Sequence, residues 1–176
     1  MPFLAAALSG CGLIGALIGT ALPLAGAKLA FSCLAEGTLV DTPSGQRAIE
    51  RLEAGDLVTG YSGRPVRILQ KHAYLESPAT RFLSIGFDDG AAVELCGMHR
   101  LAGIRARDLR LSQTIVGRKI TRIESRGGVT RSFDLLTEDA GYQIDGVPVN
   151  SMIEEMHAAA GMRFVPPAGL RGDAER

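Results

Sequence analysis

The sequence predicts a mainly β domain with an apolar helix before it and a short helix near its C-terminal end. Three observations carry this prediction. No charged residue precedes Lys28, the later segments are short, apolar and separated by turn residues, and one strand–turn pattern occurs twice. At 176 residues the chain has room for about one folded domain.

The composition excludes several classes of protein. Lys and Arg together number 19 and so do Asp and Glu, so the chain has no general attraction to nucleic acid. A hydrophobic fraction of 46% supports a buried core and excludes global disorder. Three cysteines are too few for a disulfide framework, and three histidines without metal-ligand spacing leave no zinc site. We therefore expect no metal, no small-molecule cofactor and no nucleic-acid partner.

Residues 1–32 form the first compositional unit. The uncharged apolar run over residues 3–27 is longer than the ~20 residues that cross a ~30 Å hydrocarbon core. Gly12, Gly15 and Gly19 place small residues along it, and the Gly15-x-x-x-Gly19 spacing lets a second helix approach closely. This pattern predicts a helix that inserts into a membrane or packs against copies of itself.

Other interpretations of this leader remain open. A cleaved secretory signal would normally carry a basic residue before the apolar run, and none is present here. The run Leu8-Ser9-Gly10-Cys11 resembles a bacterial lipoprotein cleavage site. A helix buried inside a large assembly, such as a virion or a secretion machine, would need the same small residues. The expected location is therefore a membrane or a virion or secreted assembly.

From about residue 33 the chain changes to short segments that alternate with turns. Turn residues at 43–45, 88–90 and 126–128 separate apolar runs, which is typical of hairpins. A helical period is found only over residues 151–160, before the candidate C-cap Gly161. The predicted strands are residues 38–42, 57–59, 66–70, 82–87, 92–95, 115–116, 120–123, 132–136 and 147–149.

An internal repeat indicates a duplicated β fold. Leu52-x5-Val58-x-Gly60 is followed by an apolar strand, and Leu109-x5-Ile115-x-Gly117 is followed by another. Two β units with the same order of strand and turn, related by a pseudo-twofold axis, would produce this repeat. It occurs twice only, which does not fit a solenoid.

Five sequence blocks, in order and at sensible spacing, resemble those of the Hint superfamily. This is the shared fold of inteins, Hedgehog C-terminal domains and bacterial autoprocessing modules. The blocks are Cys33-x3-Gly37-Thr38-x-Val40-x-Thr42-x2-Gly45, Ile49-Glu50-x-Leu52-x2-Gly55-Asp56-x-Val58, Val93-Glu94-Leu95-Cys96-Gly97-Met98-His99, Ser132-Phe133-Asp134-Leu135 and Gly146-Val147-Pro148-Val149-Asn150-Ser151. The resemblance implies a horseshoe-shaped, pseudo-twofold Hint domain over residues 33–158, with a flexible tail over 159–176, in a bacterial or phage protein.

The resemblance also implies a self-processing reaction between Ser32 and Cys33. A Cys directly after a peptide bond can attack the preceding carbonyl and turn the amide into a thioester, an N–S acyl shift. Water or another nucleophile then resolves the thioester. His99 would protonate the departing amide nitrogen as general acid. Asp134 would handle the thiol proton or orient the group.

Cys96 departs from the family pattern, which usually has Thr at this position. A thiol donates a weaker hydrogen bond than a hydroxyl, so activation of the Ser32 carbonyl would be weaker. The simpler interpretation of Cys96 is a small buried residue. The alternative is a reversible disulfide with Cys33 that blocks the nucleophile. His72 and His157 match no motif and are expected to be solvated structural residues.

The C-terminal block also departs from splicing inteins, which end in a His-Asn pair. This chain has Asn150 and Ser151 there, so Asn does not hold the terminal position and no His precedes it. A register shifted by one residue would make these two residues a candidate C-terminal junction, with Asn150 as the cyclising residue and Ser151 as the next nucleophile, but still without the assisting His. We therefore expect cleavage without full splicing, by a single-turnover reaction. The alternative function is a non-catalytic structural protein that uses the Hint scaffold to anchor its apolar helix. Ligation to a lipid alcohol would need a sterol-binding extension, which the sequence does not show.

Overall fold

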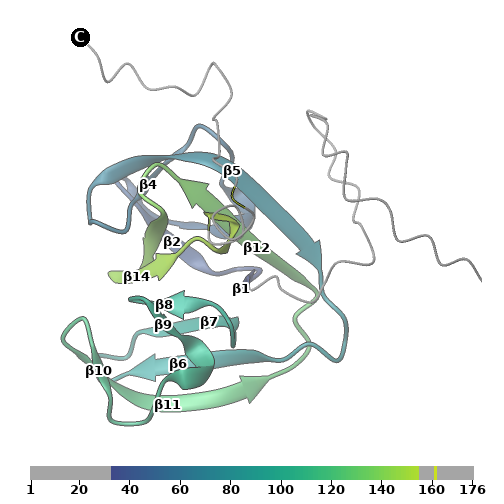
Figure 1. Cartoon of the computed structure of the whole chain (residues 1–176), viewed down its shortest axis with the longest axis vertical. Coiled ribbons are helices and arrows are strands. Elements are labelled where there is room, and N and C mark those ends of the chain that lie inside the picture. Colours follow the sequence, from purple (N-terminus) through teal and green to yellow (C-terminus); the bar gives the residue numbers. More distant parts are fainter. Residues whose placement is uncertain (1–32, 155–160, 162–176) are drawn as a thin grey trace, which may run out of the picture.

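The structure is a computed structural model that describes residues 33–154 and 161. Strands dominate it, with two short 3-10 helices and a helical turn that begins at Met152 (Figure 1). The elements are β1 (Leu34–Ala35), β2 (Leu39–Thr42), β3 (Gly45–Ala48), η1 (Ile49–Arg51), β4 (Leu57–Thr59), β5 (Pro65–Leu75), β6 (Phe82–Phe87), β7 (Ala92–Cys96), β8 (Arg100–Leu101), β9 (Ile104–Arg105), η2 (Ala106–Asp108), β10 (Thr114–Ile115), β11 (Arg118–Arg126), β12 (Arg131–Thr137), β13 (Gly141–Ile144) and β14 (Val147–Asn150).

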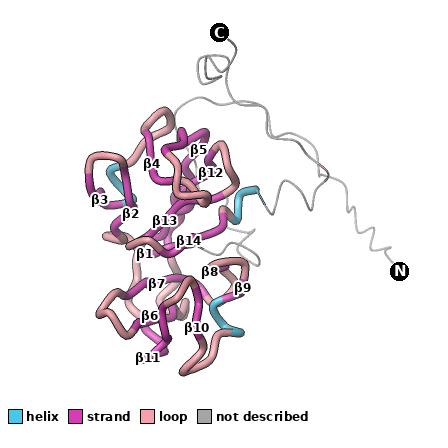
Figure 2. The backbone as a smooth tube through the Cα atoms, turned by 90° about the vertical axis from the view of Figure 1, so that its left-hand side faces the viewer, coloured by secondary structure: helices cyan, strands magenta, loops and turns pink. Residues whose placement is uncertain are grey.

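The order of strands in the main sheet is symmetric about its centre, as the predicted pseudo-twofold topology requires. Its eight strands run β10-β11-β6-β7-β1-β12-β5-β4. Strands at equal distances from the centre correspond, so β1 matches β7, β12 matches β6, β5 matches β11 and β4 matches β10. The units β1–β6 and β7–β12 exchange their last strands, because β6 lies between β7 and β11 while β12 lies between β1 and β5. Figures 1 and 2 show the two resulting lobes, one above the other.

The internal repeat of the sequence maps onto corresponding elements of the two units. In the first unit, η1 leads to the buried Leu52 and then to the β4–β5 hairpin. In the second unit, η2 leads to the buried Leu109 and then to the β10–β11 hairpin. Each leucine donates its backbone N–H to the first residue of its 3-10 helix, over 3.3 Å in both cases. The repeat in the sequence therefore reflects a repeat in the structure.

The centre of the sheet is the short pair β1 and β7, which joins the two lobes. Leu34 is fully buried and pairs with Leu95 of β7 on one side and Phe133 of β12 on the other. One continuous apolar core extends from this point into both lobes. Its fully buried members include Val40, Ile49, Leu52, Val58, Ile68, Ile85, Leu95, Leu101, Ile120, Leu135, Tyr142, Val147 and Val149.

The strands that the sequence did not predict are short or polar. β4 and β6 have the predicted bounds, whereas β5 and β11 extend beyond them. Within the described chain, β1, β8 and β9 contain two residues each, too few for an alternating pattern. β3 is exposed along three of its four residues and pairs with β2 across a two-residue turn. β13 was also missed; it pairs with β14 and carries the fully buried Tyr142.

Of the two predicted terminal helices, only the start of the C-terminal one falls within the described residues. The segment predicted to form the N-terminal helix, with Gly12, Gly15 and Gly19, lies outside the described residues, as does most of the predicted tail. Among the residues that the structure describes, no helix is both long and apolar enough to cross a membrane. The C-terminal helix begins at Met152, one residue after its predicted start, and its continuation is outside the described residues. Gly161 has a φ of 67°, as a C-cap glycine adopts.

Candidate functional site

Strand register gathers three of the predicted site residues on one face of the central sheet. Because Leu34 pairs with β7 and with β12, the preceding residue, Cys33, lies opposite Cys96 on one side and opposite Asp134 on the other. Directly opposed residues of antiparallel strands point to the same face, with Cβ atoms about 4.5–5.5 Å apart. The Cys33 carbonyl also accepts a hydrogen bond from the Cys96 backbone N–H over 3.0 Å. Residues distant in sequence therefore meet at the junction of the two units.

The Cys33 thiol lies in an environment that disfavours its ionised form. Its side chain is 1% exposed, and this burial is the main reason that its pKa is well above the ordinary value. The negative charge of Asp134 raises the pKa further, as do Cys96 and Glu76, while the neighbouring Ser132 side chain lowers it. At neutral pH Cys33 is therefore a thiol, and nucleophilic attack requires a group that accepts its proton.

Cross-strand pairing also brings the two cysteines within range of a disulfide. Residues paired in this way have Cα atoms about 4.5–5.5 Å apart, which lies within the range that a disulfide bridges. Both side chains are thiols in the structure. We expect diamide to take two hydrogens from Cys33 and Cys96 and join them. Mass spectrometry of a Cys11→Ser chain would show a loss of two hydrogens that dithiothreitol reverses.

A Cys96→Ser chain is the matched control for this oxidation. It retains Cys33 and is expected to show no internal cross-link. If both thiols stayed alkylatable after diamide treatment of the folded chain, Cys96 would have no redox role. It would then be a small structural residue, although partly exposed rather than buried as the simpler interpretation expects.

His99 lies in the turn that leaves β7. Its side chain is fully buried, and its backbone N–H donates to the Cys96 carbonyl over 3.0 Å. Its own carbonyl accepts a hydrogen bond from Ala106, at the start of η2, over 2.8 Å. Two backbone hydrogen bonds, through Cys96, thus connect the backbone of Cys33 to that of His99. The turn holds the imidazole in the protein interior at the end of the strand beside the nucleophile.

Asp134 is the most extensively hydrogen-bonded side chain of the site. One carboxylate oxygen accepts from the Leu135 N–H (2.9 Å) and the Tyr142 hydroxyl (3.1 Å). The other accepts from the N–H groups of Met152 (2.8 Å) and Ile153 (2.9 Å). Burial raises the pKa of this carboxyl to about 7, against the pull of these four donors. Asp134 therefore caps the helical turn that follows β14 and ties it to β12.

Four further polar residues share this face, and sequence analysis assigned no functional role to any of them. On β5, His72 lies opposite Asp134 and Tyr74 lies opposite Ser132. The His72 Nδ1 and the Tyr74 hydroxyl are 2.7 Å apart. Burial and the charges of Cys33 and Asp134 raise the pKa of Tyr74. Glu76 follows β5 and accepts a hydrogen bond from Ser132.

His72 is partly buried and hydrogen-bonded, so it is not the solvated side chain expected from the sequence. The spacing of His72, Tyr74 and Glu76 at every second residue would place them on one face of a strand. The predicted strand ended at residue 70, so this pattern was not used. Ser132 was included in a predicted strand as an ordinary strand residue.

The candidate C-terminal junction has structural roles. The Asn150 side-chain oxygen accepts from the Gly103 N–H over 3.1 Å, across to the β8–β9 turn. Ser151 is 1% exposed; its N–H donates to the Ala140 carbonyl, and its hydroxyl accepts from the N–H of Glu154. Asn150 therefore joins β14 to the other lobe, and Ser151 is the N-cap of the helical turn.

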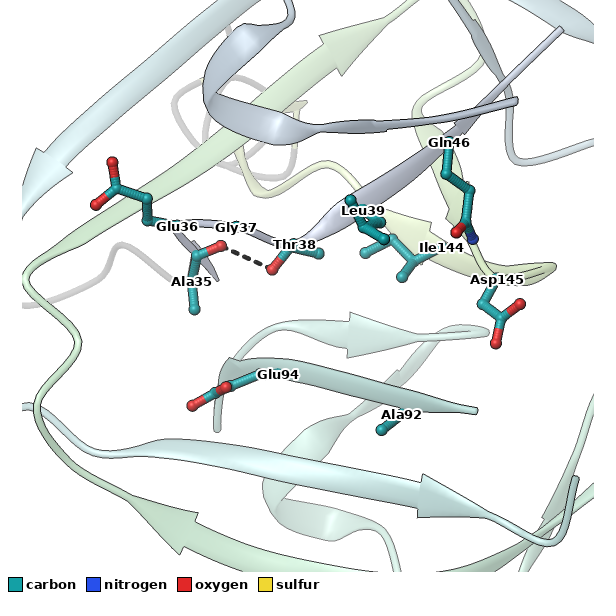
Figure 3. A pocket seen from close by; sticks show the side chains of 10 residues that line it. All are labelled: Ala35, Glu36, Gly37, Thr38, Leu39, Gln46, Ala92, Glu94, Ile144 and Asp145. Carbon is teal, nitrogen blue, oxygen red and sulfur yellow. Dashed lines mark hydrogen bonds between the residues drawn. The ribbon is translucent and has the colours of Figure 1, made fainter. Parts of the chain in front are cut away.

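A cleft of about 390 Å³ opens beside this face. Ala35 and Glu94, each two residues from a site cysteine, lie on one side of it, and Gln46 and Asp145 lie on the other (Figure 3). Within the described part of the chain, no group of three or more His, Cys, Asp or Glu side chains could hold a metal ion. The complete lining is Ala35, Glu36, Gly37, Thr38, Leu39, Gln46, Ala92, Glu94, Ile144 and Asp145.

Comparison with known proteins identifies similar domains. A family model described as a Hint domain matches residues 32–84. A search of curated proteins finds no match. The gp41-1 intein crystal structure is 19% identical, with a TM-score of 0.58 over 69% of this chain and 99% of that chain.

Two more solved structures show the same fold. The Msm DnaB1 intein splicing domain, a crystal structure with bound zinc, is 25% identical, with a TM-score of 0.57 over 67% of this chain and 99% of that chain. A bacterial intein-like domain from Clostridium thermocellum is 16% identical, with a TM-score of 0.59 over 69% of this chain and 99% of that chain. The strands described above therefore form the fold shared by inteins and intein-like domains.

Proposed function

Because the chain belongs to the Hint superfamily, we propose that it processes itself at the peptide bond between Ser32 and Cys33. The observation that carries this proposal is the position of Cys33, buried directly before β1 and between Cys96 and Asp134. Ser32 itself lies outside the described residues. A nucleophile at the junction of an apolar leader and a folded β domain can cleave the leader from the domain.

The first step exchanges an amide for a thioester. The Cys33 sulfur attacks the carbonyl carbon of Ser32, and the bond from that carbon to the Cys33 nitrogen breaks. The nitrogen takes up a proton from His99 and becomes the free amine of Cys33, while the thiol proton passes to a base. Water then attacks the thioester carbonyl, which releases residues 1–32 with a C-terminal carboxylate and regenerates the thiol.

The residues at the other end of the domain support cleavage without splicing. Cyclisation of an Asn requires its amide nitrogen to reach its own backbone carbonyl. The side-chain oxygen of Asn150 instead accepts a hydrogen bond from the Gly103 N–H, and Ser151 caps a helical turn. The reaction is therefore confined to the bond before Cys33.

Intact mass measurement tests this function. We expect purified wild-type chain, incubated with dithiothreitol, to give a product that begins at Cys33, because the added thiol intercepts the thioester. Cys33→Ala is expected to stay full length. Cys96→Ser, which removes a neighbouring thiol but keeps the nucleophile, is the matched control and should still cleave.

A wild-type chain that stays full length under these conditions would contradict the proposal. The alternative function, a structural protein anchored by its apolar leader, would then be favoured. It is supported by the uncharged run over residues 3–27 and by the Gly15-x-x-x-Gly19 spacing. The partner would be a membrane or further copies of the chain in an assembly, and a detergent-dependent oligomer that Gly15→Leu disrupts would support it.

A further inference from the structure

A buried hydroxyl and a carboxylate form a hydrogen-bonded pair next to the nucleophile. Ser132 is fully buried, and its hydroxyl donates to the Glu76 Oε1 over 2.5 Å. Ser132 pairs with Ala35 on β1, so it shares a sheet face with Cys33, two residues before Ala35. Side chains that are diagonal to each other on adjacent strands are within reach. The Ser132 side chain is also near enough to Cys33 to lower the pKa of its thiol.

The proposed reaction needs a proton acceptor that Asp134 is poorly placed to supply. The Asp134 carboxylate already accepts four hydrogen bonds, two on each oxygen, which occupy about all of its acceptor positions. Accepting the thiol proton would break contacts that hold the helical turn after β14. Glu76 is only partly buried, so its carboxyl can exchange the proton with solvent after each transfer.

We propose that Ser132 and Glu76 form a proton relay that deprotonates Cys33 as it attacks Ser32. This inference rests on the proposed function and names two further residues for it. As the sulfur–carbon bond forms, the thiol proton moves to the Ser132 oxygen and the Ser132 hydroxyl proton moves to Glu76. The hydroxyl ends unchanged, Glu76 ends as a carboxylic acid, and solvent later removes its proton.

The effect of neutralising Glu76 on the cleavage rate shows whether Glu76 accepts the proton or acts only through its charge. The negative charge of Glu76 disfavours the Cys33 thiolate, so a neutral residue at position 76 lowers the pKa of the thiol. If Glu76 acted only through its charge, Glu76→Gln would therefore speed thioester formation. A relay predicts the opposite, because glutamine cannot accept the proton.

The rate of thiol-induced cleavage tests the relay. We expect Glu76→Gln and Ser132→Ala each to slow it by about 10²-fold, the lower end of general acid–base contributions. The double variant should be little slower than either single variant, since both break the same path, and Glu76→Asp should recover part of the rate. Glu124→Gln, an exposed carboxylate on β11, is the matched control and should cleave at the wild-type rate. A Glu76→Gln rate equal to or above wild type would overturn the relay.

A titration separates failure of the relay from failure of the proposed function. In an uncleaved His99→Gln chain with Cys11→Ser and Cys96→Ser, thiolate absorbance reports the pKa of Cys33. Ser132→Ala should raise this pKa and Glu76→Gln should lower it, whether or not the wild-type chain cleaves. Normal wild-type cleavage without these two shifts overturns the relay alone. Both shifts in a protein whose wild-type chain never cleaves overturn the processing function, and with it the catalytic role of the pair.

Discussion

Replacement of His99 by Gln is expected to slow cleavage before Cys33 by about 10²–10⁴-fold, the usual contribution of a general acid. The amide nitrogen of Cys33 is a poor leaving group until it gains a proton. His99 is a fully buried imidazole in the turn that leaves β7, the strand that pairs with β1, and its backbone N–H donates to the Cys96 carbonyl. Glutamine keeps much of the size and hydrogen-bonding ability of the side chain but cannot deliver a proton at neutral pH.

The measurement is the rate of dithiothreitol-induced cleavage, followed by intact mass. Since His99 is fully buried, the thermal midpoint of each variant must be measured beside its rate. A variant that unfolds at the wild-type temperature and cleaves slowly has lost the acid and kept the fold. The comparison variant is His72→Gln, whose side chain lies opposite Asp134 on the sheet face that carries Cys33. If His72→Gln slowed cleavage strongly while His99→Gln had little effect, the acid would be His72.

The sequence predicted much of the fold because the fold repeats a simple unit. The paired leucines Leu52 and Leu109, each followed by a strand and a tight turn, occupy corresponding places in the two units. The exchange of β6 and β12 was not predictable from local patterns. The exchange is determined by long-range pairing. No residue within β6 or β12 indicates which of the two units the strand will pair with.

The site was predictable only where a motif existed. Cys33, His99 and Asp134 were chosen by resemblance, and strand register places Asp134 opposite Cys33. Ser132 and Glu76 could not be found in this way, because a serine in a strand and a carboxylate after one are ordinary residues there. Their significance comes from a hydrogen bond between residues 56 positions apart. The capping role of Asp134 was equally hidden, because the N–H groups that it caps, those of Met152 and Ile153, follow a different strand.

Truncation of Asp134 to Ala is expected to be the most destabilising change in the site, by about 3–5 kcal/mol. Its carboxylate accepts from three backbone N–H groups and one hydroxyl, and all four bonds are buried. A buried donor left without an acceptor costs about 1–3 kcal/mol, so several lost at once add to a large share of a typical stability of about 5–15 kcal/mol. Urea unfolding should show a lower midpoint with a similar slope.

Asp139→Ala is the matched control for this substitution. Asp139 also accepts several hydrogen bonds, from the N–H groups of Tyr61 and Ser62 and from the Ser62 hydroxyl, but those to Ser62 are exposed. Water can replace an exposed acceptor, so this variant should lose about 1 kcal/mol or less. Equal losses in the two variants would show that burial of the Asp134 contacts is not what matters. A much larger loss for Asp134→Ala would show that the buried carboxylate opposite Cys33 fixes the exit of β14 against β12.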